Sequence, residues 1–290
     1  MADGSATIPD GAALRAGRPR ASFDLNASTW VGLALVGIPL LAALCAPLLT
    51  AADPMALSAQ TLRAPSLAHL MGTDDLGRDV FARVLYGGRI SLIVGLFSAL
   101  IAITIGTTVG MISGYFEGRV DEILMRITEI FQIIPRFLLA IVVVALLGGG
   151  IVKVIVVIGI LGWVGTARVV RAQLLVLRRE EFVLAATLGG ASSWRIITRH
   201  ILPNVVPFII VSGSLQTGGA ILTESFLSFL GLGDPARPSW GLLLQQAQLY
   251  LQQAWWMSTF PGIALSMTIL GLNLVGDGLA SKFGARKIAR

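Results

Sequence analysis

Few residues of this chain have the types and spacing that enzyme chemistry needs. A phosphate-binding P-loop requires a glycine before its lysine, and no lysine here follows a glycine. The only cysteine, Cys45, cannot form a disulfide within the chain, and His69 and His200 are too distant in sequence for a local metal-binding motif. Motifs of zinc proteases and serine hydrolases are missing too. The sequence therefore predicts no catalytic residue, no cofactor site and no metal site in this chain.

The composition places the chain in a lipid environment. Hydrophobic residues make up 55% of the 290 residues and charged residues 13%, against about 25% charged residues in soluble domains. The apolar residues form long runs, and a bilayer core about 30 Å thick needs roughly 20 such residues per helix. We predict an all-α polytopic membrane protein with six transmembrane helices. Their expected ranges are 30–50, 90–113, 124–148, 151–172, 205–232 and 257–279.

The third span is the least regular of the six. Polar residues, among them Arg126, Glu129 and Arg136, precede its dense apolar run. Because proline removes a helical hydrogen bond, we expect a kink near Pro135. The glycines at 148–150 then predict a tight reversal into the fourth span, since glycine adopts positive φ angles at little cost.

Lysine and arginine concentrate in alternate connections between the predicted spans. Cytoplasmic loops are enriched in these residues, so we expect both termini and the 173–204 segment to be cytoplasmic. Residues 1–28 lack apolar periodicity and are expected to form a disordered cytoplasmic tail, with a basic tail at 280–290. This topology accounts for the net charge of +6 without a nucleic-acid partner.

Glu224 is the clearest ionisable residue within a predicted span. A carboxylate in hydrocarbon is costly unless it faces protein or water. It is either a structural group that is hydrogen-bonded to a neighbouring helix or a residue of a transport or proton pathway. Asp277, near the predicted end of the last span, is expected only to cap or anchor that end.

The cytoplasmic segment 180–204 is too polar to span and too patterned for a linker. Its apolar residues predict a short helix that Gly189 and Gly190 terminate, and Ser192 can cap a second helix that runs to about Ile201. Pro203 is expected to end that second helix and begin the return to the membrane. Such an element suits either docking into a groove of another protein or lying on lipid headgroups.

The spacing of small residues, glycine and Leu-Pro in this segment resembles the EAA loop of ABC importer permeases. In that family the loop forms a coupling helix that contacts the ATPase subunit. Leu184 stands where the family has glutamate, so Glu181 becomes the candidate for an acidic contact. The resemblance implies that the following residues form the ATPase-coupling loop: Glu181, Leu184, Ala185, Ala186, Gly189, Gly190, Leu202 and Pro203.

A segment before the second span resembles the external segment of dipeptide/oligopeptide/nickel-type permeases. Further matches in the same order include Gly114 to Phe116 with Asp121, and Pro238 to Gly241. Together they cover about residues 69 to 279. The external residues that carry the resemblance are Gly72, Thr73, Asp74, Gly77, Arg78 and Asp79.

Spacing suggests a physical role for this external segment. Thr73 or Asp74 can cap a helix whose apolar positions, from Val80 to Leu85, recur at three and four residues. We expect an amphipathic helix at the outer surface, which either closes the outer mouth against a partner permease or contacts substrate. Trp240, Trp255 and Trp256 are expected to be interfacial anchors.

These expectations divide the chain into a first span with the external segment, residues 29–89, and a five-helix permease core, residues 90–279. The resemblance implies one of two transmembrane subunits of an importer, paired as a heterodimer with a homologous permease in the bacterial inner membrane. It implies two cytoplasmic ATPase subunits that bind ATP and Mg, and an external solute-binding protein that delivers di- or oligopeptides. Nickel, glutathione or another small solute is the alternative cargo, and a membrane scaffold without transport is the alternative of a different class.

Overall fold

The computed structural model describes residues 27–288, and side chains within 27–283. The expected tail at 1–28 therefore lies almost entirely outside the described residues. In the described part every named element is a helix. The elements are α1 (Ala27–Leu44), α2 (Ala46–Leu49), α3 (Val80–Phe116), α4 (Gly118–Ile133), α5 (Arg136–Leu147), α6 (Ile151–Leu177), α7 (Glu181–Leu188), α8 (Ser193–Arg195), a π-helical turn (Ile196–Ile201), α9 (Leu202–Phe229), α10 (Trp240–Ala247), a 3₁₀ turn (Gln248–Tyr250) and α11 (Trp256–Ile288).

Five helical stretches in residues 27–288 are long and apolar enough to cross a membrane, and the bent pair of α4 and α5 makes six if it is counted as one broken span. The two halves of this broken span are bent by 80°. Ile134 is extended because a residue before proline is excluded from helical geometry, and Pro135 precedes the first residue of α5. The predicted kink is confirmed, and it is a break between two helices. The fold is thus the expected all-α, polytopic membrane architecture.

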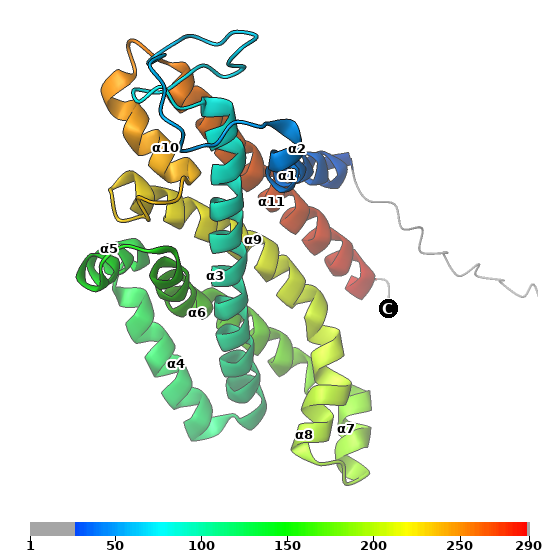
Figure 1. Ribbon diagram of the computed structural model, residues 1–290. Coiled ribbons are helices and arrows are strands. Elements are labelled where there is room, and N and C mark those ends of the chain that lie inside the picture. Colours follow the sequence, from blue (N-terminus) through cyan, green and yellow to red (C-terminus); the bar gives the residue numbers. More distant parts are fainter. Residues whose placement is uncertain (1–26, 289–290) are drawn as a thin grey trace, which may run out of the picture.

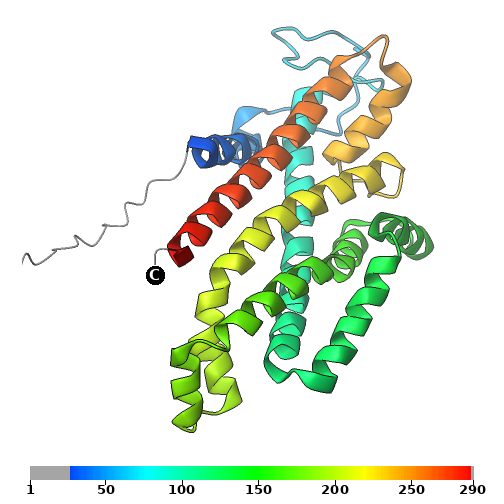
Figure 2. The same cartoon turned by 180° about the vertical axis from the view of Figure 1, so that it is seen from behind.

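The bundle has two distinct ends (Figure 1). The loop between α2 and α3 lies with α10 at one end, while α7 and α8 project at the opposite end. The view from behind shows the same separation (Figure 2). Helix α3 extends between the two ends, because its 37 residues give it a length of about 55 Å.

Helices α3 and α6 are in close backbone contact along a stripe of glycines on α3. A Cβ at Gly106 would lie 2.5 Å from the Trp163 carbonyl oxygen, and one at Gly110 would lie 2.5 Å from the Ala167 carbonyl oxygen. In a membrane, such small residues at intervals of four let two helices approach closely and gain dispersion contacts. Glycine is therefore required at these positions of the α3–α6 contact.

Two predictions about helix boundaries at the external end are wrong. The helix that was expected to be capped by Thr73 or Asp74 begins at Val80, and the Asp79 side chain accepts the capping hydrogen bond from the Ala82 amide. The expected amphipathic surface helix does not form separately, because its residues are the first turns of α3. Its apolar face, including Val84, packs with Trp240 in the protein core instead of facing the outer surface.

Boundaries near the other end also differ from expectation. Pro203 does not end a helix: the π-helical turn leads directly into α9, with Pro203 in its first turn. A proline at this position has no amide hydrogen to satisfy, so the helix continues through it. Asp277 lies inside α11, which continues to Ile288, so Asp277 is not a cap and most of the expected basic tail is helical.

Replacing Gly110 with leucine should weaken the α3–α6 contact, because the added side chain meets backbone that cannot move without displacing α6. We expect a loss of about 1–3 kcal/mol or more of stability, the usual range for overpacking. Thermal unfolding of the detergent-purified subunit measures this loss. The control is Thr108→Leu, on an exposed position of the same helix. Equal unfolding temperatures for the two variants would contradict the contact.

Candidate functional site: a docking helix, a capped end and an open cavity

Helix α7 presents an apolar face to solvent. Leu184, Ala185 and Leu188 are exposed, with Leu188 at 90% of its maximal accessibility. Residues spaced by three and four lie on one face of a helix, and Glu181 extends the same face by one turn. Val183 points the opposite way and is buried. A one-turn apolar patch with an acidic residue at its edge suits contact with another protein.

The end of α7 is fixed by glycine geometry, as expected. Gly190 has a φ of +75°, a conformation that costs about 1 kcal/mol or more for other residues. The Ala191 amide then donates to the Ala186 carbonyl at 3.1 Å. Gly189 has no such requirement, since its φ is −75°. The Ser192 hydroxyl accepts a hydrogen bond from the Arg195 amide, which confirms the predicted cap of the next helix.

A shared apolar cluster connects α7 to the membrane helices. Val183 of α7 packs with Leu174 of α6, Ile196 and Ile201 of the π-helical turn, and Val205 of α9. All five side chains are buried. Helix α7 therefore cannot move without displacing the adjoining ends of α6 and α9.

Leu202 and Pro203 lie where the π-helical turn becomes α9. Leu202 is partly buried and Pro203 is exposed. Proline cannot supply the amide that a regular helix would use at this point, and the wider π-helical turn accommodates its ring. The Asn204 side-chain amide donates to the His200 carbonyl at 2.7 Å, so that oxygen is satisfied. These two residues shape the exit from the loop and do not lie on the exposed face of α7.

Ion pairs join the α3–α4 turn to the end of α6. Arg171 donates from two nitrogens to the two carboxylate oxygens of Asp121, at 2.7 and 2.6 Å. Arg178 donates to the Tyr115 carbonyl and pairs with Glu117, both at 3.0 Å. Bidentate arginine–carboxylate pairs fix geometry as well as charge. The sequence marked Asp121 only through the family resemblance, and the arginine partners were not predicted.

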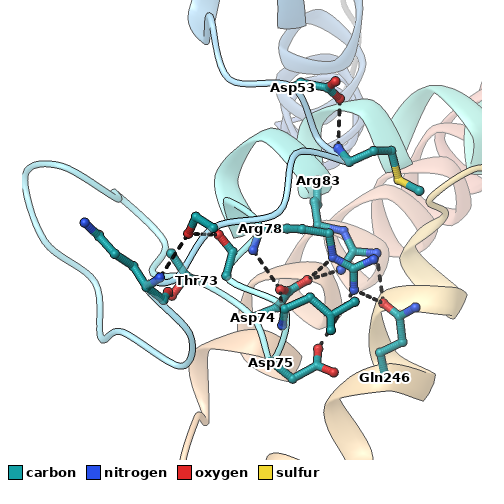
Figure 3. Close-up of polar contacts among 12 residues, drawn as sticks. Asp53, Thr73, Asp74, Asp75, Arg78, Arg83 and Gln246 are labelled. Atoms are coloured by element: carbon teal, nitrogen blue, oxygen red, sulfur yellow. Dashed lines mark hydrogen bonds and ion pairs between the residues drawn. The ribbon is translucent and has the colours of Figure 1, made fainter.

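The external segment is organised around a buried carboxylate (Figure 3). Asp74 accepts hydrogen bonds from Arg78 Nε at 2.7 Å and from Arg83 of α3. Arg83 also donates to Gln246 of α10 at 2.8 Å. All three ionic groups are buried, with Arg83 only 2% exposed. The segment, α3 and α10 are thereby held together, and Gln246 is a participant that sequence reasoning missed.

The other external residues fold the loop onto itself. The Thr73 hydroxyl donates to the Gln60 carbonyl at 2.5 Å, and the Asp79 carboxylate accepts from His69 Nδ1 at 2.9 Å. Gly72 and Gly77 have φ angles of +76° and +71°. A Cβ at Gly77 would lie 2.1 Å from the Ser58 carbonyl oxygen, so the loop could not close over a larger residue. The six predicted residues do come together, as a packed cap.

The tryptophans at this end are mostly structural. Trp240 is buried, and its indole nitrogen donates to the Val84 carbonyl at 3.0 Å. Trp256 is also buried and donates to the Thr73 carbonyl at 3.1 Å. Only Trp255 is exposed in the way an interfacial anchor would be. The prediction of three anchors is wrong for two of them, because each has a carbonyl within reach of its indole nitrogen inside the core.

Glu224 lies in a polar contact between helices. It is 3% exposed and accepts hydrogen bonds from Ser91 of α3 at 3.1 Å and from Ser228 at 2.7 Å. The Trp240 amide donates to the same Ser91 hydroxyl at 3.2 Å. The carboxylate therefore links α9, α3 and the start of α10. Glu224 does not line the cavity of about 510 Å³ that lies between α5, α6 and α9.

A cavity of about 510 Å³ opens between α5, α6 and α9. Its volume is within the roughly 300–1,000 Å³ of ligand pockets. Glycines widen it: near Gly165 of α6 and Gly219 of α9, no described heavy atom lies within 4 Å of the place where a Cβ would stand. Apolar side chains make up much of the lining, and its polar members are Arg136, Thr166, Ser212, Gln216 and Thr223.

In the described part of the chain, no group of three or more histidine, cysteine, aspartate or glutamate side chains is placed to hold a metal ion. The arrangement is instead suited to transport. Helix α7 with its exposed apolar face, an ion-paired loop at the opposite end and an open cavity between them are the arrangement expected of a membrane permease subunit.

The family follows from comparison with known proteins. Residues 106–288 match the family described as "Binding-protein-dependent transport system inner membrane component". The chain belongs to this family of ABC importer permease subunits, which are multi-pass membrane proteins and not enzymes.

Named relatives agree. The chain is 45% identical to the glutathione transport system permease protein GsiD of Pectobacterium atrosepticum, over 74% of this chain and 72% of that protein. It is 42% identical to the dipeptide transport system permease protein DppC of Alkalihalophilus pseudofirmus, over 86% and 83%. It is 39% identical to the oligopeptide transport system permease protein OppC of Bacillus subtilis, over 89% and 85%.

Replacing Asp74 with asparagine should destabilise the external cap, because Arg78 and Arg83 would remain buried without their carboxylate. Breaking a buried pair by removing one partner costs about 3–5 kcal/mol. We expect faster protease cleavage within residues 50–79 and a lower unfolding temperature of the purified subunit.

The matched control is Asp75→Asn. Asp75 is adjacent in sequence and more exposed than Asp74. Its ion pair with Arg78 is long, at 3.9 Å. Its removal should change cleavage little. If Asp74→Asn and Asp75→Asn were cleaved at the same rate, the central role of Asp74 would be refuted.

Proposed function

We propose that this chain forms half of the translocation path of an ABC importer for di- or oligopeptides. A homologous permease forms the other half in a heterodimer, and an external solute-binding protein delivers the peptide. Two cytoplasmic ATPase subunits bind ATP and Mg and supply the energy. The chain lies in the bacterial cytoplasmic membrane with both termini in the cytoplasm.

The observation that carries this proposal is the exposed apolar face of α7 at the end of the bundle opposite the external cap (Figure 1). A docking surface is needed where an ATPase binds, and the basic segments of the sequence favour this end as the cytoplasmic one. Glu181, Leu184, Ala185, Ala186 and the Gly190 turn would form the contact. Gly189, Leu202 and Pro203 would support its shape.

Rigid connection supports a transmission role for α7. The buried cluster of Val183, Leu174 and Val205 couples α7 to α6 and α9, and both of these helices line the cavity. Movement of the ATPases would therefore change the cavity walls, as alternating access requires. The cap around Asp74 would close the outer mouth against the partner permease, and Glu224 would act as a structural link.

Peptide cargo is supported by the names of two of the relatives, which transport dipeptides and oligopeptides. Glutathione is a second candidate because one relative is a glutathione permease. Uptake of labelled peptides and of glutathione by the reconstituted importer distinguishes them. Uptake of glutathione alone would replace the peptide proposal with the second candidate.

Replacing Leu188 with glutamate should disrupt ATPase docking, because a charge would enter an apolar contact. We expect substrate-stimulated ATP hydrolysis to fall at least about tenfold, which corresponds to 1.4 kcal/mol. The ATPases should also co-purify less with the subunit. Leu249→Glu is the control, since Leu249 is similarly exposed, at 85%, but lies beside α10 at the other end. Undiminished stimulation in Leu188→Glu would exclude α7 as the docking helix.

Filling the cavity should block transport while the fold is retained. A phenylalanine at Gly219 projects into open space, so we expect normal thermal unfolding and loss of most peptide uptake. Gly37→Phe is the control, because Gly37 of α1 also has no described heavy atom near its Cβ position but does not line the cavity. Uptake that survives in Gly219→Phe would show that peptides take another route.

A further inference from the structure

Arg136 is in an unusual position for an arginine. It is the first residue of α5, at the break of the broken span. Helix α4 starts beside the end of α3 and runs for 16 residues, or about 24 Å, before the break. The break therefore lies away from the end of the bundle at which α7 and α8 project (Figure 1).

No hydrogen bond or ion pair joins Arg136 to any residue whose side chain the structure describes. The side chain is exposed and lines the 510 Å³ cavity. Arg78, Arg83, Arg171 and Arg178, which are buried or half-buried, have carboxylate partners. Arg136 is distinguished by its place on the cavity wall. Arginine at membrane depth is costly unless it faces a water-filled cavity or a partner of opposite charge.

The helix N-terminus at Arg136 carries a partial positive charge, as the guanidinium of its side chain carries a full one. A helix N-terminus carries unsatisfied amides and a partial positive charge. Pro135 at the cap position of α5 supplies no side-chain acceptor, so these amides are not capped within the subunit. Broken membrane helices often direct such N-termini towards anionic groups of the substrate.

The cavity has no acidic group to neutralise this charge. Arg136 is the single charged residue among the described residues that line it. Gln216, Thr166, Ser212 and Thr223 supply neutral hydrogen-bonding groups on the facing helices. The buried carboxylate of Glu224 accepts hydrogen bonds from serines and does not line this cavity.

We infer that Arg136, with the N-terminus of α5, binds the C-terminal carboxylate of the peptide during its passage. The guanidinium matches a carboxylate in two parallel hydrogen bonds, and the polar residues of α6 and α9 face the rest of the peptide. This inference rests on the proposed peptide function. It assigns Arg136 as a specificity residue that selects peptides with a free carboxylate.

The same carboxylate chemistry could come from the partner permease. An aspartate or glutamate of that subunit could face the cavity and pair with Arg136 in the assembled importer. The test therefore separates a carboxylate of the substrate from one of the partner.

The experiment uses the complete importer in proteoliposomes with ATP and the binding protein. The probes are a defined mixture of synthetic alanine-based di- to pentapeptides and the same mixture as C-terminal amides. Uptake is measured by mass spectrometry and divided by the amount of each peptide that the binding protein holds. The variants are Arg136→Gln and Arg136→Lys. The control is Arg126→Gln, on α4, outside the cavity and at an exposed site.

We expect Arg136→Gln to reduce uptake of the free peptides about tenfold and that of the amides less than twofold. Arg136→Lys should retain part of the uptake, since it keeps the charge but loses the two parallel hydrogen bonds, and Arg126→Gln should match the unaltered importer. Where the binding protein does not hold a peptide amide, only the corresponding free peptide is compared. For these free peptides, the decisive result is that uptake falls in Arg136→Gln and recovers in part in Arg136→Lys, while the partner permease co-purifies as before.

Several results would overturn the inference. Equal loss of free and amidated peptides, or loss of the partner permease on purification, would assign Arg136 to a contact between subunits. Unchanged uptake in Arg136→Gln would show that the carboxylate is bound elsewhere. An unaltered importer that takes up neither set of peptides would instead refute the peptide function itself, and the inference with it.

Discussion

The close contact of α3 with α6 is the interaction on which the rest of this structure depends. Helix α3 follows the Asp74 loop at its beginning, and α6 leads directly into α7 at its end. Lipid tails give no hydrophobic drive for two membrane helices to associate, so close packing must hold them. Gly106 and Gly110 allow that packing by bringing the α6 backbone against α3. Through this pair the two ends of the subunit become one mechanical unit.

Charge distribution follows from the cost of ionisable groups in hydrocarbon. At both ends of the bundle the buried or half-buried arginines are paired, as Arg83 is with Asp74 and Arg171 with Asp121. These pairs lock loops to helices, which is why they occur where the chain leaves regular structure. Arg136, at the break between α4 and α5, is exposed and lies outside this rule, on the wall of the cavity. An unpaired charge at a cavity wall is more useful for binding than for stability.

Much of the architecture could be predicted from the sequence because it depends on local rules. Long apolar runs indicated the spans, Pro135 indicated the break, and Ser192 and Gly190 indicated where helices start and stop. The boundaries of α3 and α9 could not be found in this way. Nothing in the local sequence shows that Val84 packs on Trp240, or that a π-helical turn carries the chain through Pro203.

The candidate site was predictable only in part, for a similar physical reason. Spacing predicted the short helix and turn of the 180–204 loop, and resemblance pointed to Asp74, whose partner Arg78 is four residues away. Gln246 contacts Arg83, and Arg171 contacts Asp121, across long sequence separations. Only the fold brings these residues together. The tryptophans were misassigned because an aromatic residue near a span end has the same local pattern whether its indole faces headgroups or a core carbonyl.

The arrangement of apolar clusters connects the short helix α7 to the cavity. Val183 is buried among side chains of α6, the π-helical turn and α9, and a well-packed cluster transmits displacement because it has few voids to absorb it. The cavity is lined by the same two membrane helices, with glycines at Gly165 and Gly219 on its walls. The third wall, α5, is joined to α4 through the break at Pro135 and packs against α6 through Ala140 and Val144. A shift of α6 would therefore change the cavity and the surroundings of Arg136 together, so release of a bound carboxylate and movement of the docking helix would be coupled events.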